Sequence, residues 1–143
     1  MKIQKKIVSL GLSLLVLSGT VSSAMAYVYK NGTEYQTVTH KNIPAWGDAH
    51  FDTTYGSKKT MASQIGTFKK TKGDAALGNY AALITSSKKV VSDVGGLPLN
   101  QAILLSEYGC SKGTVYFSLV SSHILEPSNT CDVTLKFSAD NLY

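Results

Sequence analysis

The sequence of 143 residues contains no arginine, only two cysteines, three prolines and one tryptophan. All 14 basic residues are therefore lysines. Planar, bidentate capture of phosphate or carboxylate is the work of arginine, so anion binding would rely on lysine charges and backbone N–H groups. The motifs G-x-S-x-G and H-E-x-x-H, a glycine-rich phosphate loop and EF-hand spacing are also missing. These absences argue against the hydrolase, metalloprotease, nucleotide-binding and calcium-binding classes that such motifs mark.

The first 26 residues have the pattern of a secretory leader. Three lysines precede an apolar run at 7–17, and Ala24-Met25-Ala26 forms a cleavage site of the A-x-A type. We expect a signal peptide over 1–26 and a single secreted domain over 27–143. That domain has 11 lysines against 9 acidic residues, which gives little reason to expect a nucleic-acid partner. No later apolar run approaches the ~18 residues of a membrane span, so no transmembrane segment is expected after cleavage.

The composition of the remaining chain favours strands over helices. Residues 27–143 contain 12 Ser and 12 Thr together with many Tyr, Val and Gly. Threonine, tyrosine and valine suit half-buried pleated surfaces, and glycine and serine suit turns. The sequence therefore predicts an all-β fold, a small antiparallel β-sandwich or a partly open barrel.

Short apolar or alternating stretches mark the expected strands. Asn31-Gly32 predicts a tight turn within a short N-terminal hairpin or strand pair. Residues 69–74 are expected to form a charged, solvated loop. The stretches that read as strands are 50–54, 61–68, 80–85, 88–93, 102–105, 113–120 and 132–138.

The last of these stretches has the clearest pattern. Val133, Leu135 and Phe137 alternate with polar residues, which is typical of a strand with one buried face. We expect these three side chains in the core, with Lys136 and Ser138 directed outward. Residues 139–143 are expected to form a short tail.

Two cysteines in an exported chain, with none left over, predict one disulfide, Cys110–Cys131. In a simple hairpin of the strands 113–120 and 132–138, the two sulfurs would lie at opposite ends, roughly 25 Å apart. A bridge requires Cα atoms within about 7 Å. The disulfide therefore predicts that residues 121–130 run back along the molecule and cross between two sheets.

One short tract carries potential metal ligands. On a strand, Asp48, His50 and Asp52 would share one face, because side chains at i, i+2 and i+4 point the same way. Such a face could hold a divalent metal or support acid–base chemistry. The alternative is an exposed polar edge with no chemical role. No cofactor and no catalytic residue is predicted.

Aromatic and cationic residues interleave near the start of the predicted domain. The residues concerned are Tyr27, Tyr29, Lys30, Tyr35, His40 and Trp46. Exposed, they would form a binding surface for a sugar polymer, a protein or a lipid headgroup zone. Alternatively, most of the tyrosines fill the core.

The leader, the Lys/Thr/Ser/Tyr-rich domain and the absence of arginine resemble small secreted β-proteins of Gram-positive bacteria. That broad group includes the lactococcin-972-like bacteriocins, but no functional residue carries over from them. We expect a secreted, non-enzymatic interaction protein that acts at or outside the cell envelope, on an envelope component or a secreted protein. A bacteriocin-like toxin and a metal-dependent enzyme are the alternatives. Without a sortase motif or a lipobox cysteine, the protein is expected in the medium or loosely associated with the wall.

Overall fold

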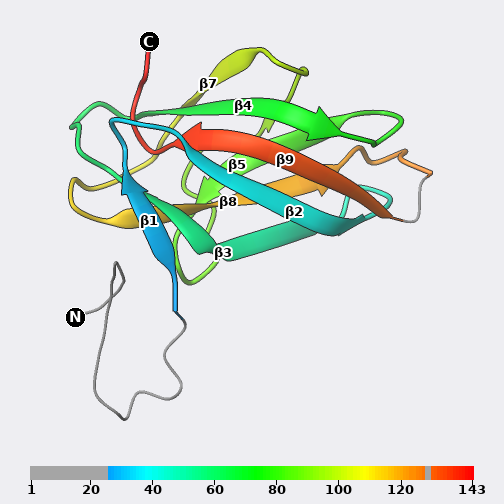
Figure 1. Cartoon of the computed structure of the whole chain (residues 1–143), viewed down its shortest axis with the longest axis horizontal. Helices are drawn as coiled ribbons and strands as arrows, with labels where there is room; N and C mark the ends of the chain where they lie inside the picture. The colour runs from blue at the N-terminus through cyan, green and yellow to red at the C-terminus, as the bar shows by residue number, and fades with distance from the viewer. Residues whose placement is uncertain (1–25, 128–129) are drawn as a thin grey trace.

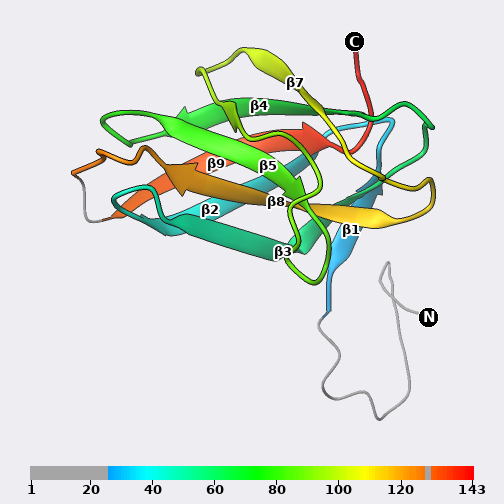
Figure 2. The ribbon, with the colours of Figure 1, turned by 180° about the vertical axis from the view of Figure 1, so that it is seen from behind.

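The computed structural model describes residues 26–127 and 130–143, and these residues form strands and loops without a helix. The predicted leader lies, apart from Ala26, outside the described residues. The strands are β1 (Val28–Asn31), β2 (Gln36–Pro44), β3 (Ala49–Lys58), β4 (Ile65–Gly73), β5 (Asn79–Ile84), β6 (Gly95–Gly96), β7 (Ala102–Ser106), β8 (Val115–Ser122) and β9 (Thr130–Ser138). They form two stacked layers (Figures 1 and 2). The all-β, sandwich-like prediction is confirmed, and these strands close no barrel.

The two sheets exchange strands along the chain. One sheet has the order β1-β3-β8-β5-β6, and the other has the order β2-β9-β4-β7. All pairs are antiparallel except β1 with β3. Strand β8 ends and β9 begins at the same end of the sandwich, on the right of Figure 1. We call this the loop end. We call the opposite end, where Lys59 and Glu107 form a buried ion pair, the ion-pair end.

The core lies between the sheets, and β9 contributes its centre as the alternation predicts. Val133, Leu135 and Phe137 are buried, and Phe137 stacks on Phe68 with ring centroids 5.5 Å apart. Lys136 points outward, as expected. Ser138 does not, because its hydroxyl donates a hydrogen bond of 2.6 Å to a backbone carbonyl at the ion-pair end.

The predicted disulfide Cys110–Cys131 is wrong, since both cysteines are buried as free thiols. Cys131 pairs with Ile43 at the start of β9. The N–H group of Cys110 donates to Gln64, the residue before β4, near the other end of β9. Seven residues of strand separate the two positions by roughly 20 Å.

The predicted crossing between two sheets does occur, between β8 and β9. It takes place at the loop end, where the described residues 123–127 remain, and these residues do not run back along the sandwich (Figure 1). The crossing between the sheets therefore forms without a disulfide, and the topology does not depend on the pairing of the cysteines.

The N-terminal hairpin is also wrong, although its turn is present. The N–H group of Glu34 donates to the carbonyl of Asn31, which closes the turn. The chain then changes sheets, so that β1 pairs in parallel with β3 and β2 pairs with β9. A turn signal fixes a local reversal but not the partner of the strand after it.

Two segments expected to be solvated are structured. Residues 69–73 extend β4, and the buried Lys70 side chain donates to Asn79 Oδ1 at 3.3 Å. In the expected tail, Ala139 and Asp140 are fully buried. Both segments gain their order from contacts with distant parts of the chain.

Candidate functional site

The structure places the residues predicted as metal ligands, Asp48, His50 and Asp52, in different surroundings. His50 Nδ1 lies 2.9 Å from His40 Nδ1, an interaction between the two sheets. The Asp52 carboxylate accepts the backbone N–H groups of Thr54 and Tyr55. Within residues 26–127 and 130–143, no group of three or more His, Cys, Asp or Glu side chains could hold a metal ion, and Asp48 joins no such group.

His40 is fully buried between the sheets. Its two ring nitrogens lie 2.9 Å from His50 Nδ1 and 2.8 Å from the hydroxyl of Ser118. Burial, and secondarily the charge of His50, lower the pKa of His40 to about 3. The imidazole is therefore neutral at ordinary pH, and its hydrogen bonds link the two sheets.

Three loops, residues 45–48, 74–78 and 123–127, converge at the loop end. The buried carboxylate of Glu126 accepts the backbone N–H groups of Ala76 at 3.1 Å and Leu77 at 2.7 Å. The backbone carbonyl of Glu126 accepts the N–H group of Trp46 at 3.3 Å. One residue thus holds all three loops in place.

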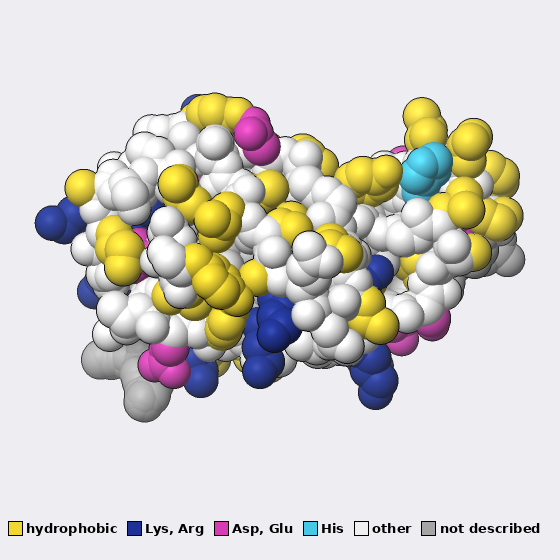
Figure 3. Space-filling view, turned by 90° about the horizontal axis from the view of Figure 1, so that it is seen from above, with side chains coloured by type: hydrophobic (Ala, Val, Ile, Leu, Met, Phe, Trp, Pro, Cys, Tyr) yellow, Lys and Arg dark blue, Asp and Glu magenta, His cyan; other side chains and the backbone are white. Residues whose placement is uncertain are grey.

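These loops present large apolar side chains to solvent. The exposed fractions are 61% for Trp46, 48% for Leu77, 70% for Ile124 and 62% for Leu125. Figure 3 shows hydrophobic side chains gathered around a histidine at this end of the molecule. Trp46 has φ of 61°, a conformation that bulky residues rarely adopt. Apolar surface concentrated on protruding loops marks an interaction site.

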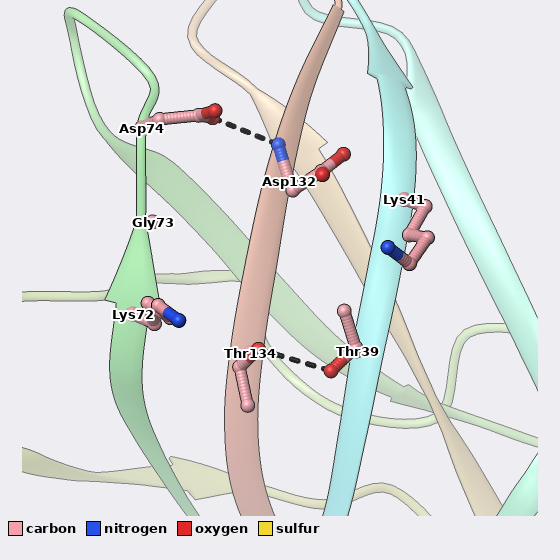
Figure 4. Close-up of a pocket in the computed structure, with 7 residues that line it drawn as sticks. All are labelled: Thr39, Lys41, Lys72, Gly73, Asp74, Asp132 and Thr134. Carbon is pink, nitrogen blue, oxygen red and sulfur yellow. Dashed lines mark hydrogen bonds between the residues drawn. The ribbon is translucent and has the colours of Figure 1, made fainter.

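An open groove of about 530 Å³ lies next to these loops, on the outer face of the four-stranded sheet. It crosses β9 between the ends of β2 and β4 (Figure 4). The residues that line it are Thr39, Lys41, Lys72, Gly73, Asp74, Asp132 and Thr134. The hydroxyls of Thr39 and Thr134 hydrogen-bond to each other at 2.9 Å across its floor.

The charges of the groove balance. The ammonium groups of Lys41 and Lys72 reach toward β9 from opposite sides (Figure 4). Asp74 accepts the backbone N–H of Asp132 at 2.8 Å, and Asp132 accepts the backbone N–H of Asn42 at 2.9 Å. Two fixed carboxylates beside two lysines suit a ligand that carries both a positive and a negative group.

The aromatic tract of the sequence is divided in space. Tyr27 packs its ring against Phe117 at 5.5 Å on the outer face of the five-stranded sheet, whereas Trp46 lies on the loop end. Tyr27 and Tyr29 are exposed, so these tyrosines do not fill the core. Sequence reasoning recognised Trp46, but it missed Ile124 and Leu125. Their signal is an apolar pair inside a segment otherwise rich in Ser, Pro and Asn.

No family model matches the chain, and no curated protein matches it either. The described residues contain no helix that is long and apolar enough to cross a membrane. Interpretation of the site therefore depends on its own geometry and chemistry.

Proposed function

We propose that this chain is a secreted, non-enzymatic interaction protein that docks through its loop end on a phospholipid surface of the cell envelope. The observation that carries the proposal is the set of four exposed apolar side chains on three loops fixed by Glu126. The partner we infer is a bilayer with zwitterionic headgroups.

The shape and composition of the loop end favour a lipid surface. Burying one large apolar side chain contributes about 1.5–3 kcal/mol, so four half-exposed side chains supply on the order of 5 kcal/mol. Trp46 is suited to the headgroup boundary, where an aromatic ring meets both apolar and polar surroundings. The protruding loops need no matching concave partner, because a fluid bilayer adapts to their shape.

The neighbouring groove determines the headgroup preference. A zwitterionic headgroup offers a phosphate to Lys41 and Lys72 and an ammonium to Asp74 and Asp132. Because these four charges cancel, apolar contact dominates the expected affinity. Binding should therefore depend weakly on salt, in contrast to attraction by exposed lysines alone.

Sedimentation with vesicles tests this function. The protein is purified from the cells that produce it and mixed with vesicles of phosphatidylcholine and phosphatidylethanolamine, at low and at physiological salt concentration. We expect binding at both, and at least a tenfold loss for the double variant Ile124→Ser/Leu125→Ser. Tyr108→Ser is the matched control, since Tyr108 is 58% exposed but lies outside the loop end.

Two outcomes would contradict the proposal. One is that neither wild type nor control sediments with any vesicle. The other is binding only to vesicles rich in phosphatidylglycerol, and only at low salt, which would mean that lysine charge rather than the apolar loops attracts the protein.

A bacteriocin-like toxin would use the same apolar loops and then damage the bilayer. The two functions differ in the fate of the bilayer after docking, so vesicles loaded with a fluorescent dye separate them. Docking without dye release supports the interaction protein. Dye release that Ile124→Ser/Leu125→Ser abolishes would favour the toxin instead.

A further inference from the structure

A lysine and two carboxylates form a fully buried cluster at the ion-pair end. Lys59 follows β3, Glu107 follows β7 and Asp140 follows β9, so the cluster joins both sheets. Lys59 Nζ lies 2.7 Å from Glu107 Oε1 and 3.6 Å from Asp140 Oδ1, and all three side chains have no exposed surface.

The reactive ends of Lys59 and Asp140 are held in fixed positions. Lys59 Nζ donates to the backbone carbonyl of Ala139 at 2.7 Å. The Asp140 carboxylate accepts the backbone N–H groups of Thr60 and Met61, each at about 3 Å, and the hydroxyl of Thr60. These donors reach both carboxylate oxygens, where they would stabilise negative charge that develops on oxygen.

Glu107 differs from Asp140 in its surroundings. Apart from the ion pair with Lys59, neither of its carboxylate oxygens has a hydrogen-bond partner among the described residues. Burial raises the pKa of its carboxyl to about 6, against the opposing effect of the Lys59 ammonium. Such a group can both accept and release a proton near neutral pH.

Two glycines lie against the carboxylates of Asp140 and Glu107, and their lack of a side chain leaves room for these groups. A Cβ atom at Gly32 would collide with the Asp140 carboxylate, and one at Gly66 would lie 2.9 Å from Glu107 Oε2. The backbone therefore approaches closely on both sides, and the cluster is enclosed by protein.

We propose that Lys59 and Asp140 join through an intramolecular isopeptide bond, an amide between Lys59 Nζ and the side-chain carboxyl carbon of Asp140, with Glu107 as the proton carrier. The bond would link the end of β3 covalently to the segment after β9, and so tie the two sheets together.

The chemistry is a condensation that needs no further reactant. Glu107 takes a proton from the Lys59 ammonium and passes it to an Asp140 oxygen, so that a neutral amine attacks the carbon of a neutral carboxyl group. The N–H groups of Thr60 and Met61 hold the oxygen that gains negative charge. Glu107 then carries the second proton from the nitrogen to the departing hydroxyl group, which leaves as water. One C–N bond forms, one C–O bond breaks, and ammonium plus carboxylate become amide plus one water molecule.

The location favours the bond over the ion pair. One ammonium and two carboxylates are buried together in a region from which water is excluded, and each buried charge carries a desolvation cost. Forming the amide removes one charge of each sign, and the fixed geometry replaces the encounter that such a reaction requires in solution.

Intact mass spectrometry of the denatured wild-type protein tests the proposal directly, once its N-terminal residue has been identified. We expect a mass below that of the sequence by one water molecule, and a protease fragment in which the peptides containing Lys59 and Asp140 remain joined. The full sequence mass, with the two peptides separate, would overturn the proposal whatever the variants do.

Variants assign the roles. Lys59→Ala should restore the full mass, Glu107→Gln should leave most of the protein unlinked, and Lys112→Ala, at an exposed lysine, should retain the water loss. A succinimide at Asp140 would also lose water, but it needs no lysine and opens in mild alkali, whereas the amide survives. Water loss that persists in Lys59→Ala would therefore overturn the bond.

Discussion

The two ends of the sandwich each contain a fully buried glutamate, and the partners of these two glutamates differ. Glu126 at the loop end accepts backbone N–H groups from a neighbouring loop. Glu107 at the ion-pair end has no such donor among the described residues and faces the ammonium of Lys59 at 2.7 Å. The same side chain thus organises exposed loops at one end and a closed charge cluster at the other.

This difference separates stability from binding. At the ion-pair end the three clustered charges are inside, so substitutions there should act on the free energy of unfolding. At the loop end, hydrogen bonds to Glu126 hold the backbone of the loops, and the apolar side chains face solvent. Substitutions of these side chains should therefore act on binding. Substitutions and acid can test this division, from the largest expected effect to the smallest.

Lys59→Ala should have the largest effect on stability. It removes the proposed covalent link and also the group that neutralises two buried carboxylates, and the loss of a buried pair alone costs about 3–5 kcal/mol. Thermal and urea unfolding measure the loss, with Lys112→Ala expected to stay within about 0.5 kcal/mol of wild type. Equal unfolding midpoints for Lys59→Ala and Lys112→Ala would show that the ion-pair end does not stabilise the fold.

Acid should destabilise the middle of the sandwich through His40. Its folded pKa is lowered to about 3, whereas the unfolded imidazole titrates near 6.5. The unfolded state therefore takes up the proton first, so stability is fully present above pH 6.5 and falls as the pH drops toward 3. The expected loss between pH 7 and pH 5 is about 2 kcal/mol.

Urea unfolding at both pH values, in wild type and in His40→Gln, isolates this contribution. Between pH 7 and pH 5, the free energy of unfolding should fall by about 2 kcal/mol less in the variant than in wild type. If the free energy of unfolding falls equally with pH in the two proteins, His40 does not remain neutral in the folded state.

Glu126→Ala should have a smaller effect on stability and a clear effect on docking. Water can reach the N–H groups of the surface loops, so we expect a cost of about 1 kcal/mol. The loop 74–78 would lose its bonds to Glu126, whereas the backbone bond from Trp46 would remain, and vesicle affinity should fall. A stability loss as large as that of Lys59→Ala, with unchanged vesicle binding, would reverse the roles assigned to the two ends.

Ile124→Ser should have the smallest effect on unfolding, within about 0.5 kcal/mol, because the side chain is already exposed. Its effect should appear in vesicle affinity, where losing about 1.5 kcal/mol of apolar burial corresponds to roughly a tenfold change. Unfolding and sedimentation on the same preparation check both parts. A variant that is destabilised yet binds normally would contradict the assignment.

The sequence predicted those features that depend on local pattern. Alternation of Val133, Leu135 and Phe137 located a core strand and its buried face correctly. Asp140, only three residues beyond Phe137, was placed in a tail, because its order comes from Lys59 and Thr60 on a distant segment. Local periodicity carries no information about such a contact.

The error over the cysteines has a related cause. An even number of cysteines and an expected export route favour a disulfide, but neither states how far apart two strand ends lie. The short connection between β8 and β9 at the loop end leaves Cys131 there, with Cys110 near the opposite end. The candidate site was partly visible, since Trp46 was singled out. Its grouping with Leu77, Ile124 and Leu125 required three loops to converge around Glu126.

The most direct test of docking uses Trp46, the single tryptophan of the sequence, which lies on the loop end. Its fluorescence is recorded as zwitterionic vesicles are added, with and without brominated acyl chains, which quench tryptophan on contact. We predict a blue shift of the emission and quenching by the brominated lipid, both strongly reduced in Ile124→Ser/Leu125→Ser. Emission that stays unshifted and unquenched at vesicle concentrations that bind the protein would contradict docking through the loop end.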